Sequence, residues 1–403
     1  MRALTTALAT TALVATCGLV ISPMHTAAAA DGNPFDGPVG GERLGSGPAV
    51  VTAGGPTPPA VRAAAWLVAD LDTGEVLAAR APHARMRPAS TLKTLTALVL
   101  LPRLDPKTVV TGTDADAGIE GSKVGVYPGL KYSVDLLFLG MFLNSGNDAV
   151  HALASADDGG VPATVRRMNA KAGELGAFDT TVTDPTGLDA DGQLSSAYDL
   201  ALIARAGLKR KDFSRYASTK IAYYPQSTTG TYQISNQNHL LWSYPGALGV
   251  KTGYTTLARN TFVGAASRDG HRLVVTLLNA PHGVSKDAAA LLDWAFANRT
   301  ALSGVGTLVT PADVARARDP HPAASPAPTA VPRTAPASGS KTGLTAGGPL
   351  RIAQTTLAKV PLWAYGIPPL LLVMSWFRPK PKARRARASA GTGGRPVARR
   401  RRH

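Results

Sequence analysis

A proline-rich stretch near the C-terminal end limits how much of this 403-residue chain can fold. Residues 310–349 contain eight prolines among Ala, Ser, Thr and Gly, with few large apolar side chains. Such a composition cannot bury a core and is typical of an extended linker, which we predict over residues 301–356. Residues 31–59 have the same character and predict a second linker. One folded domain is then expected over residues 60–300.

The last residues carry most of the formal net charge of +17. Residues 378–403 hold eleven basic side chains and no acidic one, and the eighteen residues before them are uncharged. Eighteen helical residues would span about 27 Å, enough for a bilayer core. We predict a transmembrane helix over residues 357–377 and a basic cytoplasmic tail over 378–403. The alternative is a buried segment of a soluble domain, which Pro368 and Pro369 favour because they would kink a helix.

The N-terminal residues predict export. Arg2 precedes an apolar stretch over residues 4–21, and four alanines at 27–30 precede the polar Asp31. This is the pattern of a signal peptide, which we predict over residues 1–30, with an uncleaved anchor helix as the alternative. The folded domain is then expected outside the cell membrane, on a single-pass protein. The basic tail marks membrane topology, so no nucleic-acid partner is expected.

The number and spacing of cysteines and histidines limit which disulfides and metal sites the chain can form. Cys17 is the only cysteine, and it lies in the predicted signal peptide, where lipidation is a further alternative. The eight histidines are scattered, without an HExxH or HxH pair. We therefore expect no disulfide framework, no metal and no cofactor.

Strand signals occur at both ends of the predicted domain, with a helical middle. Apolar runs at 63–69 and 75–79 flank an Asp-Thr-Gly turn, which predicts a hairpin. Late in the domain, strands are predicted at 249–254, 261–267 and 272–278. Helices are predicted over 89–101, 133–143, 148–156, 165–175, 200–206 and 291–296. We predict an α+β fold in which helices flank an antiparallel sheet and form a helical subdomain.

The first polar motif, Ser90-Thr91-Leu92-Lys93, opens the helix predicted over 89–101, whose apolar residues surround it and predict burial. A separation of three residues places Ser90 and Lys93 on one helix face. Burial of an ammonium is unfavourable unless its pKa falls or polar partners surround it, and such a lysine activates a neighbouring serine as a nucleophile. Alternatively, Ser90 caps the helix while Lys93 extends to solvent.

Two further motifs follow along the chain. Ser145-Gly146-Asn147 lies between two predicted helices, where Ser145 could transfer protons and Asn147 hold a substrate amide, although all three are also ordinary turn residues. Lys251-Thr252-Gly253 lies on a predicted strand. There Lys251 and Thr252 could bind a carboxylate, and Gly253 would allow a ligand to lie against the backbone.

The order and spacing of the three motifs resemble the serine enzymes that recognise penicillin. With the flanking residues, the chain resembles the D-alanyl-D-alanine carboxypeptidases of peptidase family S11, over the whole predicted domain. The matching stretches are residues 88–93, 144–149, 168–172, 175–176, 184–188 and 250–255.

The resemblance implies the fold of β-lactamases and transpeptidases, and a mechanism. Ser90 would attack the carbonyl between the two D-alanines of a peptidoglycan stem peptide, with Lys93 as proton acceptor. The N–H groups of Ser90 and Tyr254 would bind the oxyanion, and Ser145 would carry a proton to the departing D-alanine. Asn147 would hold the peptide amide, and Lys251 with Thr252 the terminal carboxylate. β-Lactams would trap the acyl-enzyme.

Some features depart from the family pattern. Members often have Gly near Arg259 and an Arg in the loop before the last helix, where residues 281–288 offer His282 and Lys286. The β-rich C-terminal domain of many members is not expected here, because the predicted linker and span follow the folded domain. The alternatives are a class A-like β-lactamase, which usually has Asp where Gly146 stands, and a catalytically silent wall-binding module of the same fold.

Overall fold

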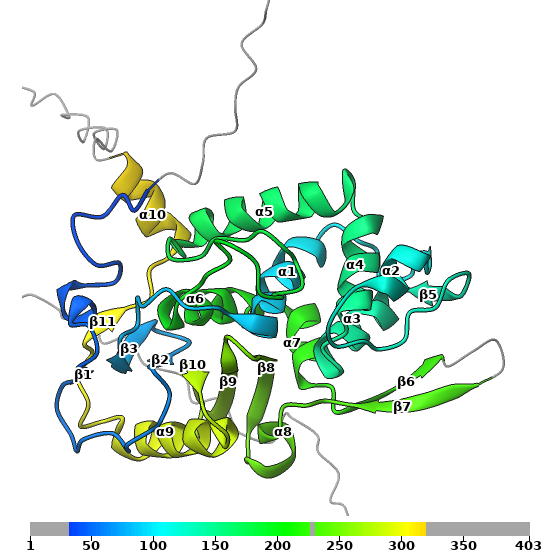
Figure 1. Ribbon diagram of the computed structural model, residues 1–403. Coiled ribbons are helices and arrows are strands. Elements are labelled where there is room, and N and C mark those ends of the chain that lie inside the picture. The colour runs from blue at the N-terminus through cyan, green and yellow to red at the C-terminus, as the bar shows by residue number, and fades with distance from the viewer. Residues whose placement is uncertain (1–31, 226–229, 320–403) are drawn as a thin grey trace, which may run out of the picture. The chain divides into compact units, whose positions relative to one another are not determined.

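An antiparallel sheet of seven strands forms the centre of the computed structural model, which describes residues 32–225 and 230–319 (Figure 1). The strand order is β1-β3-β2-β10-β9-β8, and β11 also pairs with β3. The strands are β1 (Val50–Thr52), β2 (Ala65–Asp70), β3 (Glu75–Arg80), β8 (Ala247–Thr255), β9 (Arg259–Arg268), β10 (His271–Ala280) and β11 (Gly306–Thr307).

The central strands are apolar on both faces because both faces are covered. All six residues of β2 are buried, which explains its continuous apolar run. The turn to β3 is held by Asp70, whose carboxylate accepts hydrogen bonds from Asp72 N and Thr73 N. The predicted hairpin is confirmed, and so are the three late strands, which pair as β8-β9-β10.

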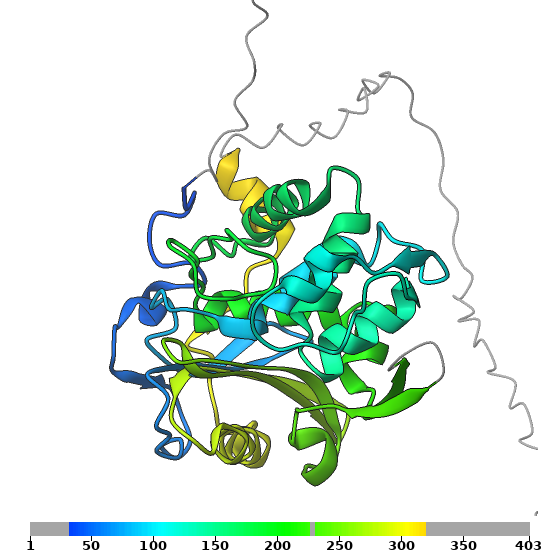
Figure 2. The ribbon, with the colours of Figure 1, turned by 45° about the vertical axis from the view of Figure 1, so that its right-hand side comes forward.

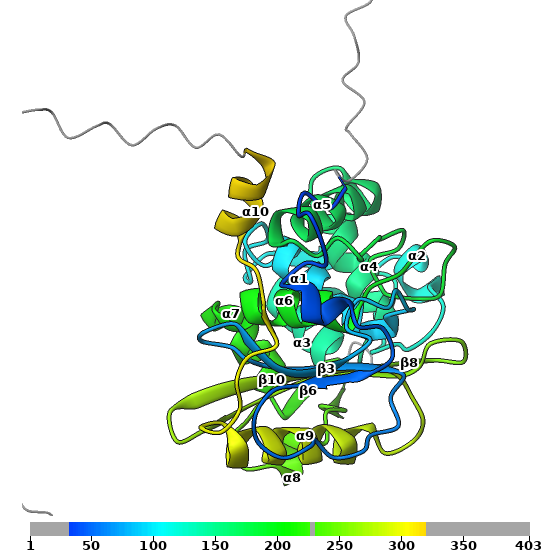
Figure 3. The same ribbon diagram turned by 90° about the vertical axis from the view of Figure 1, so that its left-hand side faces the viewer.

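Helices cover the sheet in two layers. Helix α9 (Val284–Asn298) lies against one face, where it closes a smaller apolar cluster around Trp66 and Phe262 (Figures 2 and 3). The opposite face carries the larger core. Its helices include α1 (Lys93–Leu100), α5 (Gly160–Leu175), α6 (Ala197–Leu208) and α7 (Lys211–Ser218).

A helical subdomain stands beside the sheet (Figure 1). Its helices α2 (Asp114–Gly118), α3 (Val134–Leu143) and α4 (Asn147–Ala156) are accompanied by two small hairpins, β4-β5 (Val109–Thr111 and Lys131–Ser133) and β6-β7 (Ile221–Pro225 and Thr231–Ser235). Ser133 caps α3 by accepting a hydrogen bond from Leu136 N. The predicted α+β architecture is confirmed.

Both segments predicted as linkers contain folded elements, so the folded domain extends beyond the predicted boundaries at residues 60 and 300. Within residues 31–59, β1 pairs with β3, and the short helix η1 (Glu42–Gly45) buries Leu44. Within residues 301–356, β11 pairs with β3, and α10 (Pro311–Arg318) follows. Pro311 does not prevent this helix because proline is compatible with the first helical turn, and Thr310 caps it.

The predicted signal peptide at 1–30, transmembrane helix at 357–377 and tail at 378–403 lie outside the described residues. Among the helices between residues 32 and 319, apart from 226–229, we find none with the length and apolar character of a membrane span.

Candidate active site

Ser90 lies in a tight 3₁₀ turn, η2 (Ala89–Leu92), directly before α1. The predicted helix over 89–101 therefore begins with a tighter turn, and Ala89 has a left-handed φ of 48°. Two threonines hold this turn through one carbonyl: Thr91 Oγ1 donates to Pro88 O at 2.6 Å, and Thr261 Oγ1, from β9, donates to it at 2.7 Å. The sheet thus fixes the position of the Ser90 backbone.

Lys93 is almost fully buried, with 1% of its surface exposed, and three oxygen atoms surround its Nζ. Ser90 Oγ and Asn147 Oδ1 each lie 2.7 Å away, and Thr186 O lies 2.6 Å away. The structure therefore brings the first two motifs together around one nitrogen. It excludes the alternative in which Lys93 extends to solvent.

The electrostatics favour a neutral amine. Burial, followed by the positive charge of Lys251, lowers the pKa of Lys93 well below its usual range. Burial alone lowers the pKa of Lys251 to about 7. The lowered pKa of Lys93, which the apolar helix predicts, is confirmed. The sequence did not predict that Lys251 is also buried, or that its charge contributes to this lowering.

The second motif forms a strained corner between α3 and α4. Ser145 has a left-handed φ of 60° and is 4% exposed. In the part of the chain that the structure describes, its hydroxyl makes no hydrogen bond, so it is free to bind a substrate. Asn147 is 2% exposed, and its Nδ2 donates to Glu120 O at 2.6 Å. Both amide atoms of Asn147 are therefore bonded within the protein.

The third motif lies on β8 beside the Ser90 turn. A Cβ on Gly253 would stand 2.8 Å from Ser90 N and 3.0 Å from Thr91 N, so only glycine allows this approach of strand and turn. Lys251 is 1% exposed, and its Nζ donates to Thr252 O at 2.8 Å. Its ammonium therefore faces the interior, while Thr252 faces the pocket.

A pocket of about 300 Å³ opens above Ser90. Predicted site residues from all three motifs line it, together with residues that the sequence analysis did not select. The lining consists of Ser90, Ser122, Ser145, Gln237, His239, Thr252, Gly253, Tyr254, Asn260, Thr261, Val284 and Ser285. Lys93, Asn147 and Lys251 lie beneath this surface. Across the described residues, no three His, Cys, Asp or Glu side chains come together as a metal site.

Three supporting residues were missed. Thr186 supplies a carbonyl to Lys93, and a Cβ on its neighbour Gly187 would stand 2.1 Å from Ala89 O. Asp148 is fully buried, and its carboxylate accepts backbone hydrogen bonds from residues 124–126 and Ala149. It orders the loop that brings Ser122 to the pocket. Thr186 and Asp148 could have been found from the sequence, because they lie in the family-like stretches 184–188 and 144–149. No sequence motif marks Thr261.

A family model described as D-alanyl-D-alanine carboxypeptidase, Peptidase S11, matches residues 52–282, which is more than half of the chain. This chain belongs to peptidase family S11. The family and its named relatives are D-alanyl-D-alanine carboxypeptidases, so the chain is a peptidase. The match begins inside the segment predicted as the first linker, in agreement with the position of β1.

Named relatives carry the same description. A D-alanyl-D-alanine carboxypeptidase of Mycobacterium tuberculosis is 46% identical over 242 residues, which cover 58% of this chain and 81% of that protein. One of Bacillus subtilis is 34% identical over 232 residues, covering 56% of this chain and 60% of that protein. The enzyme thus spans most of the first relative and a smaller part of the second.

Solved structures agree with the fold. A D-alanyl-D-alanine carboxypeptidase from Mycobacterium tuberculosis superposes with a TM-score of 0.61 at 44% identity, covering 64% of this chain and 99% of that chain. A mutant of the Streptomyces K15 DD-transpeptidase gives a TM-score of 0.57 at 30% identity, covering 59% and 99%. The described domain therefore has the fold of the DD-peptidases and transpeptidases, as predicted.

Proposed function

We propose that this enzyme removes the terminal D-alanine of peptidoglycan stem peptides through an acyl-enzyme on Ser90, and that β-lactams form the same adduct. The observation that carries this proposal is the 2.7 Å contact between Lys93 Nζ and Ser90 Oγ at the floor of the pocket. A buried lysine with a lowered pKa beside a serine hydroxyl is the arrangement that makes the hydroxyl nucleophilic.

The partners of Lys93 select the direction of proton transfer. Asn147 Oδ1 and Thr186 O can only accept hydrogen bonds, so they hold two N–H groups of the amine. In the neutral amine, the lone pair then faces Ser90 Oγ. As the Ser90 oxygen bonds to the substrate carbonyl carbon, Lys93 takes the hydroxyl proton. The developing oxyanion is stabilised by the N–H groups of Ser90 and Tyr254.

Collapse of this intermediate breaks the C–N bond, and the departing D-alanine nitrogen must gain a proton. Ser145 lines the pocket and its hydroxyl has no hydrogen-bond partner among the described residues, and we assign to it the transfer of the proton from Lys93 to that nitrogen. Water then attacks the ester and releases the shortened peptide. No metal or cofactor takes part in these steps.

The buried positions of Asn147 and Lys251 change their expected roles. We assign Asn147 to positioning Lys93, because both of its amide atoms are bonded within the protein. Lys251 lowers the pKa of Lys93 and supplies positive potential behind Thr252, which faces the substrate carboxylate from the pocket wall. Gly253 keeps Tyr254 close to the Ser90 turn.

We further propose that the enzyme acts at the outer surface of the cell membrane in peptidoglycan remodelling. The signal peptide at 1–30 would export it, the span at 357–377 would hold it, and the tail at 378–403 would stay in the cytoplasm. The composition of these segments supports this placement.

The test is the mass of the full-length enzyme after incubation with penicillin. We expect one covalent adduct in the parent and in Ser243→Ala, an exposed serine on α8 (Leu240–Ser243), and none in Ser90→Ala. An adduct that persists in Ser90→Ala would overturn the assignment. Release of D-alanine from a pentapeptide, with slow hydrolysis of the penicillin adduct, separates a carboxypeptidase from a β-lactamase. Absence of both reactions would indicate a silent binding module.

A further inference from the structure

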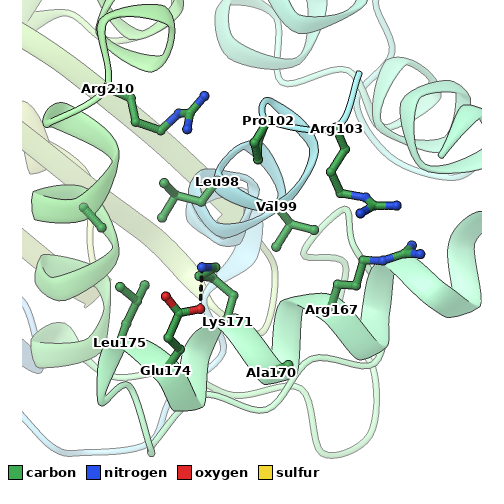
Figure 4. Close-up of a pocket in the computed structure, with 11 residues that line it drawn as sticks. Leu98, Val99, Pro102, Arg103, Arg167, Ala170, Lys171, Glu174, Leu175 and Arg210 are labelled. Carbon is green, nitrogen blue, oxygen red and sulfur yellow. Dashed lines mark hydrogen bonds and ion pairs between the residues drawn. The ribbon is translucent and has the colours of Figure 1, made fainter. Parts of the chain in front are cut away.

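Helix α1 has different neighbours at its two ends. Its C-terminal end borders a pocket of about 600 Å³, whose cations pair with carboxylates of the protein, as Lys171 does with Glu174 in Figure 4. Its N-terminal half contacts a loop formed by residues 183–193, through the side chains of Lys93 and Thr96. The charges of the pocket are therefore balanced within the protein, whereas the loop contacts the proposed proton acceptor.

Two successive carbonyl groups of this loop accept hydrogen bonds from α1. Pro185 O accepts from Thr96 Oγ1 at 2.7 Å, and Thr186 O accepts from Lys93 Nζ at 2.6 Å. Both donors lie on one face of the helix because they are three residues apart. The orientation of the Lys93 amine therefore depends on where the loop holds its carbonyl groups.

The side-chain amide of Gln193 joins the two ends of the segment 183–188. Gln193 is 1% exposed. Its Oε1 accepts from Thr183 N at 2.9 Å and from Asp184 N at 2.8 Å, and its Nε2 donates to Leu188 O at 2.6 Å. A buried amide that bonds backbone groups in this way fixes their conformation, because leaving those groups unpaired is unfavourable.

Thr186 is held between the residues that Gln193 binds. Asp184 Oδ1 accepts from Thr186 N at 2.8 Å and also from the Thr186 hydroxyl, and Thr186 Oγ1 accepts from Leu188 N at 3.2 Å. Loss of the Gln193 bonds would release the backbone of both Asp184 and Leu188. The Thr186 carbonyl would then no longer be fixed against Lys93.

We propose that Gln193 is a positioning residue for the proton acceptor. By closing the 183–188 segment, it keeps Thr186 O on Lys93, so that the lone pair of the neutral amine faces Ser90 Oγ. Gln193 is not among the residues that line the catalytic pocket, so it acts through Lys93. This inference rests on the proposed acylation of Ser90.

The charges that face Lys93 give the displacement a measurable sign. Burial is the largest cause of the lowered pKa of Lys93; Lys251 on β8 lowers it further, whereas Asp184 in the loop and Asp148 on α4 oppose the lowering. A carbonyl acceptor favours the ammonium over the neutral amine. Displacement of Thr186 O and Asp184 should therefore lower the pKa of Lys93 further.

The experiment is stopped-flow acylation of full-length Gln193→Met by penicillin, from acidic to alkaline pH. The maximal rate should fall about tenfold to a hundredfold, because the base is no longer aligned with Ser90 Oγ. The increase in rate with pH should also occur at lower pH than in the parent. A slower variant with the parent's pH profile would show a merely structural role and overturn the inference, and so would an unchanged rate. A parent that does not acylate would instead refute the proposed function.

A second variant and a control keep the test independent of the folding of Gln193→Met. Thr96→Val removes the bond to Pro185 O, and its pH profile should move in the same direction by a smaller amount. Thr310→Ala removes the cap of α10 and should destabilise the enzyme without changing acylation. Urea unfolding compares the stability of all variants. An unmoved profile in Thr96→Val, or the same shift in Thr310→Ala, would overturn the inference.

Discussion

Replacement of Lys251 by methionine should make the enzyme more stable and less active. Burial lowers the pKa of Lys251 from 10.5 to about 7, which means that folding disfavours the ammonium. At pH 7 the unfolded chain binds more protons at this residue than the folded chain does, so stability rises with pH between about 7 and 10.5. The shift corresponds to a destabilisation of about 4 kcal/mol at pH 7. Methionine fills the same space without this penalty.

The magnitude and sign are both measurable by urea unfolding followed by circular dichroism. The free-energy advantage of Lys251→Met should be largest at and below pH 7 and about 2 kcal/mol smaller at pH 9 than at pH 7, because at pH 9 the parent lysine is neutral in the folded state. The exposed Lys107→Met is the control and should show no such pH-dependent difference. A variant that is less stable than the parent, or whose advantage does not change with pH, would refute the reasoning.

Three further predictions concern the same site. Penicillin acylation should become faster as pH rises through the pKa of Lys93. In Lys251→Met this increase should occur at higher pH, because loss of the neighbouring positive charge raises the pKa of Lys93. A stopped-flow pH profile of the variant that matches the parent's would contradict this. Gly253→Ala should acylate at least about a hundredfold more slowly, since its Cβ would stand 2.8 Å from Ser90 N; near-parental rates would exclude a role for this contact in the oxyanion hole. Asp148→Asn should lower the free energy of unfolding by about 2 kcal/mol, because one oxygen cannot serve all the backbone donors, whereas exposed Asp158→Asn should have little effect in the same urea titration.

The sequence predicts the secondary-structure elements correctly where the apolar periodicity is strong. It misses the elements that are short. The β2–β3 hairpin and the β8–β10 strands are long apolar runs, and the sequence patterns located them. By contrast, β1 and β11 have three and two residues, and they form only because β3 offers an edge to pair with. Local composition carries no information on such a partner, so the domain boundaries were placed too far inside.

The site was predictable as a set of residues but not as a geometry. Ser90 and Lys93 are close in sequence, so helix spacing alone predicts their contact. Thr261 reaches Pro88 O from a strand far along the chain, and no motif marks it. For Asn147 the sequence predicts a contact with a substrate amide, and the structure adds contacts of its amide with Lys93 and Glu120 that the motif does not indicate. Which face of a polar residue meets a pocket depends on packing that the sequence patterns do not specify.

The two buried lysines differ in what they can do, and their contacts decide which of them acts as the base. Ser90 Oγ lies 2.7 Å from Lys93 Nζ, whereas Lys251 Nζ donates to the carbonyl of Thr252. Two ammonium groups in one buried site repel each other, so loss of a proton from one raises the pKa of the other. Burial, followed by the charge of Lys251, lowers the pKa of Lys93 well below its usual range, and a single proton carried by Lys251 leaves a neutral amine at Ser90 and a positive charge behind Thr252. That state provides both a neutral base for Ser90 and a positive charge that attracts a carboxylate. With both lysines protonated the base is absent, and with both neutral the positive charge is absent.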